Sequence, residues 1–125
     1  MKREDLQSIG VTQESWSEAV NLEKIIGVVA TSAEQVVGFV FCEIETSEIL
    51  VLALLPEYEN LGIGKQLLLN MISDMEERGH QRLWLAASPD DTIRAHGFYR
   101  HLGWQTTHQY DGHGDEILEY FTNPN

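Results

Sequence analysis

The feature that most constrains the fold is a change of hydrophobic period between residues 49 and 79. Residues 49–55 read ILVLALL, the most apolar run of the chain, which is typical of a central strand buried on both faces. Pro56 ends that run, and beyond Gly64 apolar residues recur at helical spacing, at Leu67, Leu68, Met71, Ile72 and Met75. Gly79 suits the position just after a helix. With residues 82–87 as the next strand, this order predicts a βαβ crossover between parallel strands.

Shorter apolar segments and turn signals predict the remaining elements. The N-terminal part is expected to form a helix over residues 12–22 and a hairpin of strands over residues 24–30 and 36–44. The C-terminal part is expected to form a helix over residues 92–102 and strands over residues 104–110 and 116–121. Gly97 inside a helix costs about 1 kcal/mol relative to alanine, so close packing is expected there. The fold class is therefore a mixed α/β layer architecture.

Length and composition restrict the class of protein. The 125 residues fit one domain, and 42% apolar residues allow a substantial core. No run of 18 apolar residues suggests a transmembrane helix, and the first ten residues do not resemble a signal peptide. The single cysteine, Cys42, fits a reducing compartment. We therefore expect a cytoplasmic protein.

The net charge of −12 argues against nonspecific binding to nucleic acid or to an anionic membrane. It is compatible with a cationic substrate, and equally with a surface that only keeps the protein in solution. The segments HGFYRH and HQYDGH each hold two histidines five residues apart, whereas a shared helical face needs three or four. No metal site is expected.

Two glycines, Gly62 and Gly64, precede the helix that follows Pro56. A glycine loop at a helix N-terminus exposes free backbone N–H groups and a partial positive charge, which together attract phosphate. The alternative is a tight strand-to-helix turn that binds nothing. The spacing matches neither a Walker loop nor the dinucleotide-binding GxGxxG, because position 67 is Leu67.

Two blocks of the sequence resemble the GCN5-related N-acetyltransferase (GNAT) superfamily. In VLALLPEYENLGIGKQLL, the stretch Glu59 to Gly64 resembles the family pattern Gln/Arg-x-x-Gly-x-Gly/Ala after a central strand. In TIRAHGFYRHLGW, the family block Asn-x-x-Ala-x-x-Phe-Tyr-x-x-x-Gly-Phe is matched at Ala95, Phe98, Tyr99 and Gly103, with Thr92 in place of Asn and Trp104 in place of Phe. The two blocks occur in the family's order, and the resemblance extends over residues 25–121.

The resemblance implies a fold and a cosubstrate. The implied fold is a mixed, mostly antiparallel sheet with one parallel βαβ crossover, splayed central strands and helices on both faces. The implied cosubstrate is acetyl-CoA or another acyl-CoA, with its pyrophosphate on the loop and its pantetheine arm beside the central strand. The residues implied to bind it are Leu52, Ala53, Leu54, Asn60, Leu61, Gly62, Ile63, Gly64, Lys65, Thr92, Ala95 and Tyr99.

The resemblance also implies direct acetyl transfer to an amine, which requires two proton transfers. Tyr99 matches the family's acid, which protonates the leaving thiolate; the alternative is a tyrosine that only packs. Glu48 matches a position where some members place the base that takes the amine's proton; the alternative is a solvated carboxylate at a strand end. Glu43 and His101 are further candidates for the base, and a water chain is another.

The sequence departs from the family at two places. Glu59 replaces Gln or Arg beside the expected pyrophosphate, where a carboxylate is repulsive unless it points away or caps the helix. Lys65 could offset it locally, and Arg94 and Arg100 are further candidates to reach the phosphates of CoA. Only 23 residues precede Lys24, so in the single domain of residues 1–125 the usual first strand and one helix are expected to be absent. That absence would expose a sheet edge, which predicts a homodimer, with Trp16 at the interface or over the sheet.

The sequence predicts an N-acetyltransferase whose acceptor is a small cationic amine, such as a polyamine or an aminoglycoside, or a protein amine. Two alternatives stay open. One is a non-catalytic module that binds or senses acyl-CoA, and the other is an interaction domain that keeps the fold without the ligand. The expected partners are acetyl-CoA and an amine, without nucleic acid or membrane.

Overall fold

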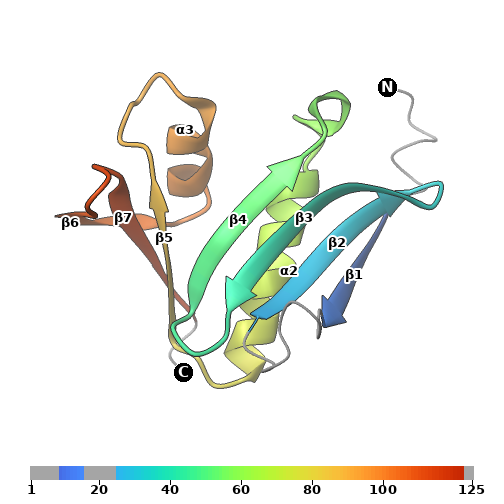
Figure 1. Cartoon of the computed structure of the whole chain (residues 1–125), viewed down its shortest axis with the longest axis horizontal. Helices are drawn as coiled ribbons and strands as arrows, with labels where there is room; N and C mark the ends of the chain where they lie inside the picture. The colour runs from blue at the N-terminus through green and yellow to red at the C-terminus, as the bar shows by residue number, and fades with distance from the viewer. Residues whose placement is uncertain (1–8, 16–24, 123–125) are drawn as a thin grey trace.

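The computed structural model describes residues 9–15 and 25–122 of the chain. Seven strands of this part form one sheet in the order β1-β2-β3-β4-β5-β7-β6 (Figure 1). The strands are β1 (Ile9–Ser15), β2 (Ile25–Ser32), β3 (Gln35–Glu43), β4 (Glu48–Leu54), β5 (Arg82–Ala87), β6 (Gln105–Tyr110) and β7 (Glu116–Phe121). The helices are α2 (Ile63–Glu77) and α3 (Arg94–His101), and η1 (Pro56–Tyr58) is one 3-10 turn.

The strands β4 and β5 are the parallel neighbours, and the other neighbouring strands pair antiparallel. One position pairs between β4 and β5, Glu48 with Trp84, and beyond it the two strands separate (Figure 1). The Trp84 N–H donates to the Ser47 carbonyl at 3.1 Å, and the Trp84 indole N–H donates to the Thr46 carbonyl at 3.0 Å. The predicted mixed sheet with splayed central strands and a βαβ crossover is confirmed.

The core forms where α2 packs against one face of β2, β3 and β4 (Figure 1). The apolar residues of α2 that the sequence places on one stripe are all buried: Leu67, Leu68, Met71, Ile72 and Met75. Alternate residues of the facing strands, such as Val28, Val40 and Cys42, are buried against them. Each large apolar side chain buried in this way contributes about 1.5–3 kcal/mol. This one-sided contact fixes the orientation of β4 relative to the start of α2.

Most element boundaries from residue 25 onward lie within two residues of the prediction. The helix α3 begins at Arg94 rather than at Thr92. The Asp90 carboxylate accepts hydrogen bonds from the Thr92 N–H and the Thr92 hydroxyl, and the Ile93 N–H donates to the Asp90 carbonyl. These bonds hold residues 90–93 in a turn, so the helix starts after it.

The prediction of a helix over residues 12–22 is wrong for residues 12–15, which belong to β1; residues 16–22, with Trp16, lie outside the described part. The expectation that the usual first strand is absent is also wrong, because β1 pairs antiparallel with β2 from Ile9–Ser32 to Ser15–Ile26. Ile, Val and Thr favour strands, and pairing with β2 decides the outcome. The homodimer therefore stays a prediction without the argument from a missing strand.

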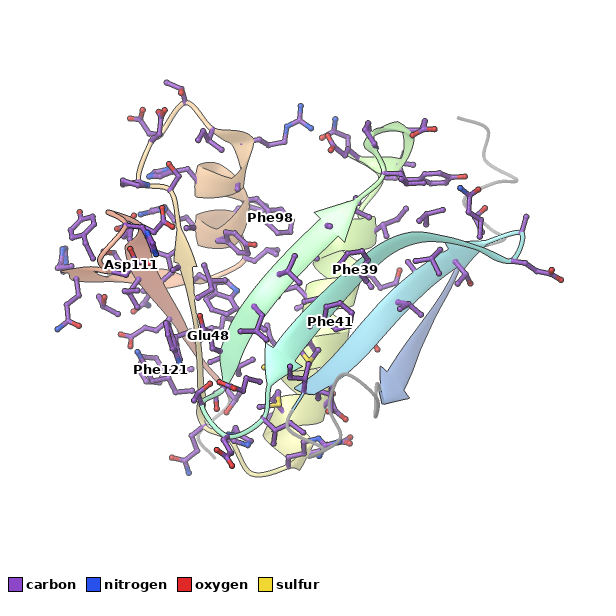
Figure 2. All side chains as sticks on the ribbon, in the orientation of Figure 1. Phe39, Phe41, Glu48, Phe98, Asp111 and Phe121 are labelled. Carbon is purple, nitrogen blue, oxygen red and sulfur yellow. The ribbon has the colours of Figure 1, made fainter. Side chains whose placement is uncertain are left out.

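The expectation that the run of residues 49–55 is buried on both faces is wrong as well. Leu50 is 44% exposed and Val51 is 39% exposed. Among the described helices, α2 packs against one face of β4, and an antiparallel pair can leave its other face open to solvent. The pairing of β4 is also incomplete. The register between β3 and β4 shifts next to Cys42, which leaves Leu50 opposite no residue of β3, and on its other edge β4 loses β5 as a neighbour. Phe41, which Figure 2 labels on β3, pairs with Val51 and does not bury it.

Two glycines have opposite surroundings. A Cβ at Gly38 of β3 would meet Leu54 Cδ2 and would lie 3.0 Å from the Ala53 carbonyl oxygen. A Cβ at Gly97 of α3 would meet nothing within 4 Å. The close packing expected at Gly97 is therefore absent, and close packing instead requires the glycine at position 38.

We predict that Gly38→Ala lowers the free energy of unfolding by about 2 kcal/mol, because the new methyl group has to push Leu54 or the β4 backbone aside. Gly97→Ala is the matched control, and it is expected to raise the free energy of unfolding by up to about 1 kcal/mol, the helix preference of alanine over glycine. Urea denaturation followed by circular dichroism measures both variants. Wild-type stability in Gly38→Ala would contradict the prediction.

Candidate active site

A cavity of about 840 Å³ opens where β4 and β5 separate, between β4, the start of α2 and α3. This volume lies within the range of small-molecule sites, about 300–1,000 Å³. β4 contributes Leu52, Ala53 and Leu54. The other residues of the lining are Glu59, Asn60, Gly62, Gly64, Lys65, Arg94, Ala95, Gly97, Phe98, Tyr99, His101 and Leu102.

The wall formed by β4 offers free backbone groups. β3 pairs with one edge of β4, up to Gly38 opposite Leu54. On the other edge, pairing with β5 stops at Glu48. The backbone groups of Leu52 to Leu54 that point into the cavity therefore have no strand partner, and an extended ligand can pair with them as an added strand would.

The floor of the cavity is the N-terminus of α2. Gly62 precedes the helix with a φ of +84°, a conformation that costs a side-chain-bearing residue energy. The first helical hydrogen bond runs from the Gln66 N–H to the Gly62 carbonyl at 3.1 Å. Within the described part of the chain, the N–H groups of Leu61 to Lys65 have no backbone acceptor and no side-chain cap. Free N–H groups together with the helix dipole make this end of α2 a site for an anion.

Glu59 lies at the mouth of the cavity and is paired with a cation. The Arg94 Nη1 donates to Glu59 Oε1 at 3.1 Å and to Asn60 Oδ1 at 3.4 Å. Arg94 is the first residue of α3 and lies 35 positions after Glu59 in the sequence. The sequence marked Glu59 as a repulsive replacement, and the structure supplies a neighbouring guanidinium.

Tyr99 comes from α3 and lines the cavity. Its ring packs edge-on against Phe98 at 5.2 Å and against Trp104 at 6.0 Å, between ring centroids. Burial raises the pKa of the Tyr99 phenol, so the group stays protonated at neutral pH. Among the described residues its hydroxyl has no hydrogen-bond partner, which leaves it free for a bound molecule. Figure 2 places Phe98, the neighbour of Tyr99, between α3 and β4.

An ion pair anchors α3 next to Tyr99. The Arg100 Nη2 donates to Glu116 Oε1 of β7 at 2.6 Å. Glu116 is only 6% exposed. A hydrogen bond from the Thr106 side chain and the Arg100 guanidinium lower the pKa of Glu116 despite its burial, so the carboxylate stays charged. Arg100 is therefore committed to holding α3 on the sheet.

Glu48, the predicted base, does not line this cavity. It lies at the closed end of the gap, paired with Trp84, at the opposite end of β4 from Leu54 (Figure 2). Burial and the nearby Glu43 carboxylate raise the pKa of Glu48. His101, one of the alternatives for the base, does line the cavity.

The structure brings together most of the other predicted residues. Thr92 is outside the lining, since it bonds to Asp90. Leu61 and Ile63 are also outside it and offer their backbone alone. The lining residues that sequence reasoning did not assign to the ligand are Glu59, Gly97, Phe98 and Leu102. Phe98 and Leu102 recur at helical spacing with Ala95, a signal that also fits ordinary core packing.

Two kinds of feature are absent from the described residues. They contain no group of three or more His, Cys, Asp or Glu side chains arranged to hold a metal ion. None of their helices is both long enough and apolar enough to cross a membrane.

Comparison with known proteins defines the class. The model of the acetyltransferase (GNAT) family matches residues 3–104, so the chain belongs to that family. A curated relative, the [ribosomal protein bS18]-alanine N-acetyltransferase of Haemophilus influenzae, is 30% identical over 74 residues, 58% of this chain and 51% of the relative. The match thus spans about half the length of that relative.

Solved structures agree on the fold. The PaiA N-acetyltransferase of Thermoplasma acidophilum, solved in complex with coenzyme A, aligns with a TM-score of 0.73 and 29% identity over 85% of this chain and 65% of its own. A GNAT family acetyltransferase of Elizabethkingia anophelis with acetyl-CoA bound aligns with a TM-score of 0.69 over 92% and 99% of the two chains. Its identity is 13%, so this second likeness shows the fold alone.

Proposed function

We propose that the chain binds acetyl-CoA in the cavity between β4 and α3 and transfers the acetyl group to a primary amine. The observation that carries this proposal is the junction of two unsatisfied backbone surfaces, the free edge of β4 and the free N–H groups at the start of α2. An acyl-CoA has a peptide-like arm for the first and a pyrophosphate for the second. The family, and the coenzyme A complex of the 29% identical Thermoplasma acidophilum acetyltransferase, support this ligand.

In this proposal the pyrophosphate accepts hydrogen bonds from the N–H groups of Leu61 to Lys65, and the Lys65 ammonium adds a positive charge. The pantetheine arm pairs with Leu52, Ala53 and Leu54, which brings the thioester into the gap between β4 and β5. Asn60, Ala95 and Tyr99 line its path.

Acetyl transfer follows from a direct attack in a ternary complex. The amine nitrogen bonds to the thioester carbonyl carbon, and a backbone N–H near Leu54 stabilises the oxyanion. When the carbon–sulfur bond breaks, the Tyr99 hydroxyl donates its proton to the thiolate. The raised pKa of Tyr99 fits this role, because the proton is present at neutral pH.

The amine must also lose a proton. Glu48 is the base that we propose, and its raised pKa brings the carboxylate closer to neutral pH. From the closed end of the gap Glu48 reaches the amine through water. His101 lies in the lining and is the alternative base.

The net charge of −12 supports a cationic acceptor, either a small amine or a protein amine. The H. influenzae relative is named for an alanine of a ribosomal protein, which makes protein amines a priority in the search. We propose a cytoplasmic location on the sequence argument from the single cysteine. The homodimer stays a proposal that the argument from a missing first strand no longer supports. A second candidate function, a non-catalytic acyl-CoA sensor, is favoured by the position of Glu48 outside the cavity.

Acetyl-CoA is expected to raise the melting temperature. Ligand at 100 times its dissociation constant stabilises the folded state by about 2.7 kcal/mol, which corresponds to several degrees. Thermal shift measures binding, and release of free CoA across a panel of amines and N-terminal peptides measures transfer. No shift at millimolar acetyl-CoA would contradict binding; a shift without turnover on any amine would favour the sensor.

Tyr99→Phe is expected to lower kcat about 100-fold, the lower end of the range for a lost general acid, with the dissociation constant of acetyl-CoA unchanged within about twofold. Tyr110→Phe is the matched control, since Tyr110 is 58% exposed on β6 outside the cavity. Steady-state kinetics and calorimetry measure the two quantities. Equal kcat in wild type and Tyr99→Phe would remove the acid role.

Glu48→Gln is expected to lower kcat/KM about 100-fold at neutral pH, and the deficit should shrink as the pH approaches the acceptor's own pKa, about 10 for a primary amine. At that pH the amine no longer needs a base. In the wild type, kcat/KM should fall as the pH drops through the pKa of Glu48, which burial and the Glu43 carboxylate raise above that of an ordinary glutamate. Glu57→Gln, outside the lining, is the control. A deficit that is constant with pH would exclude the base role.

A further inference from the structure

The ion pair of Arg94 and Glu59 spans the mouth of the cavity. Glu59 follows η1 in the loop before α2, and Arg94 opens α3. Both side chains line the cavity, and the Arg94 Nη1 bonds to Glu59 Oε1 at 3.1 Å and to Asn60 Oδ1 at 3.4 Å. One guanidinium nitrogen of Arg94 therefore connects α3 with the loop before α2, the two sides of the cavity mouth.

This pair contributes little to the stability of the fold. The Arg94 side chain is 67% exposed and the Glu59 side chain is 45% exposed. Exposed pairs are screened by water and salt and are worth about 0–1 kcal/mol. The reason for the pair is therefore better sought in the cavity that it borders.

Arg94 keeps most of its hydrogen-bonding capacity. A guanidinium has five N–H donors in a planar fork, and the contacts with Glu59 and Asn60 involve Nη1 alone. Among the described residues, Nε and Nη2 have no acceptor. An arginine held by one nitrogen presents the remaining fork as a bidentate donor, the geometry that suits a phosphate group.

Arg94 also determines the net charge of the cavity lining. The Asp, Glu, Lys and Arg side chains that line the cavity are Glu59, Lys65 and Arg94, and their net charge is +1. Without Arg94 the net charge is zero, and the Glu59 carboxylate stands without a cation beside the free N–H groups of α2. A polyanion entering that site would meet repulsion from Glu59.

We propose that Arg94 binds a phosphate group of the acyl-CoA and that Glu59 is the positioning residue that holds its guanidinium at the mouth of the cavity. The cation that the family pattern would place at position 59 is thus supplied from α3. The inference rests on the proposed function, because it specifies how the same ligand is held. It assigns a role to the carboxylate that the sequence marked as a departure.

The test compares two ligands by calorimetry: acetyl-CoA, and S-acetylpantetheine, which lacks every phosphate. Arg94→Gln is expected to weaken acetyl-CoA binding about tenfold, the effect of losing a charge-assisted hydrogen bond, and to leave S-acetylpantetheine within about twofold. Arg94→Lys keeps the charge without the fork, so an intermediate loss of about threefold is expected. The loss in Arg94→Gln should shrink as salt is raised.

Glu59 is tested through the double variant. Glu59→Gln alone should change acetyl-CoA affinity by less than about threefold, since the amide oxygen still accepts from Arg94 while a negative charge is lost. In the Arg94→Gln background, the same change should recover at least about threefold, because the carboxylate is then no longer neutralised. Additive effects of the two changes would overturn the positioning role of Glu59.

The matched control is Arg82→Gln, which removes an equal charge from the exposed Arg82–Glu119 pair on β5 and β7, outside the cavity. It should bind acetyl-CoA within about twofold of wild type. If Arg94→Gln behaves like Arg82→Gln, or weakens both ligands equally, the proposal is overturned. If the wild type itself binds no acetyl-CoA, the proposed function fails at that first measurement. Circular dichroism of each variant separates loss of folding from loss of binding.

Discussion

The separation of β4 from β5 is the constraint on which the rest of the site depends. The two strands meet at Glu48 and Trp84, where the main chain and the indole of Trp84 both donate to the turn before β4. In the same place the Ser47 hydroxyl and His80 Nδ1 lie 2.6 Å apart, which ties that turn to the loop after α2. Beyond this fixed end the two strands separate, and the edge of β4 that faces β5 is left with backbone groups that have no strand partner.

The walls of the opening are held by packing on both sides. On one side, α2 is buried along its apolar stripe, and its first turn lies at the end of β4, where a Cβ at Gly64 would lie 3.4 Å from Leu54 Cδ1 and 3.5 Å from Phe98 Cζ. On the other side, the Arg100–Glu116 pair and the aromatic contacts of Trp104 with Tyr99 and Tyr120 hold α3 on β7. Buried contacts therefore hold both walls in place, whereas the Arg94–Glu59 pair between them is largely exposed and contributes little to the stability of the fold.

Sequence patterns predicted the elements where local signals and tertiary packing agree. The helix α2 could be predicted because its one buried face produces apolar residues at helical spacing. The turn before it could be predicted because a residue with positive φ, as at Gly62, is commonly glycine. The sequence patterns gave wrong predictions at β1 and β4. At β1, residues that suit a helix N-terminus predicted a helix, and pairing with β2 makes the segment a strand. At β4, the apolar run predicted burial on both faces, and part of the run is exposed. At Gly97 the pattern indicated packing, and the structure has open space toward the cavity.

The sequence by itself determined the family, the crossover, the glycine turn and the place of Tyr99 on a helix, because these depend on residues close together in the chain. Only the tertiary structure decided which distant residues meet. It placed Arg94 beside Glu59, committed Arg100 to Glu116, and left Glu48 at the closed end of the gap. Electrostatic interactions depend on distance in space and not on separation in the sequence. Glu59, which departs from the family pattern, therefore gains Arg94 as a partner only because α3 packs beside the loop before α2.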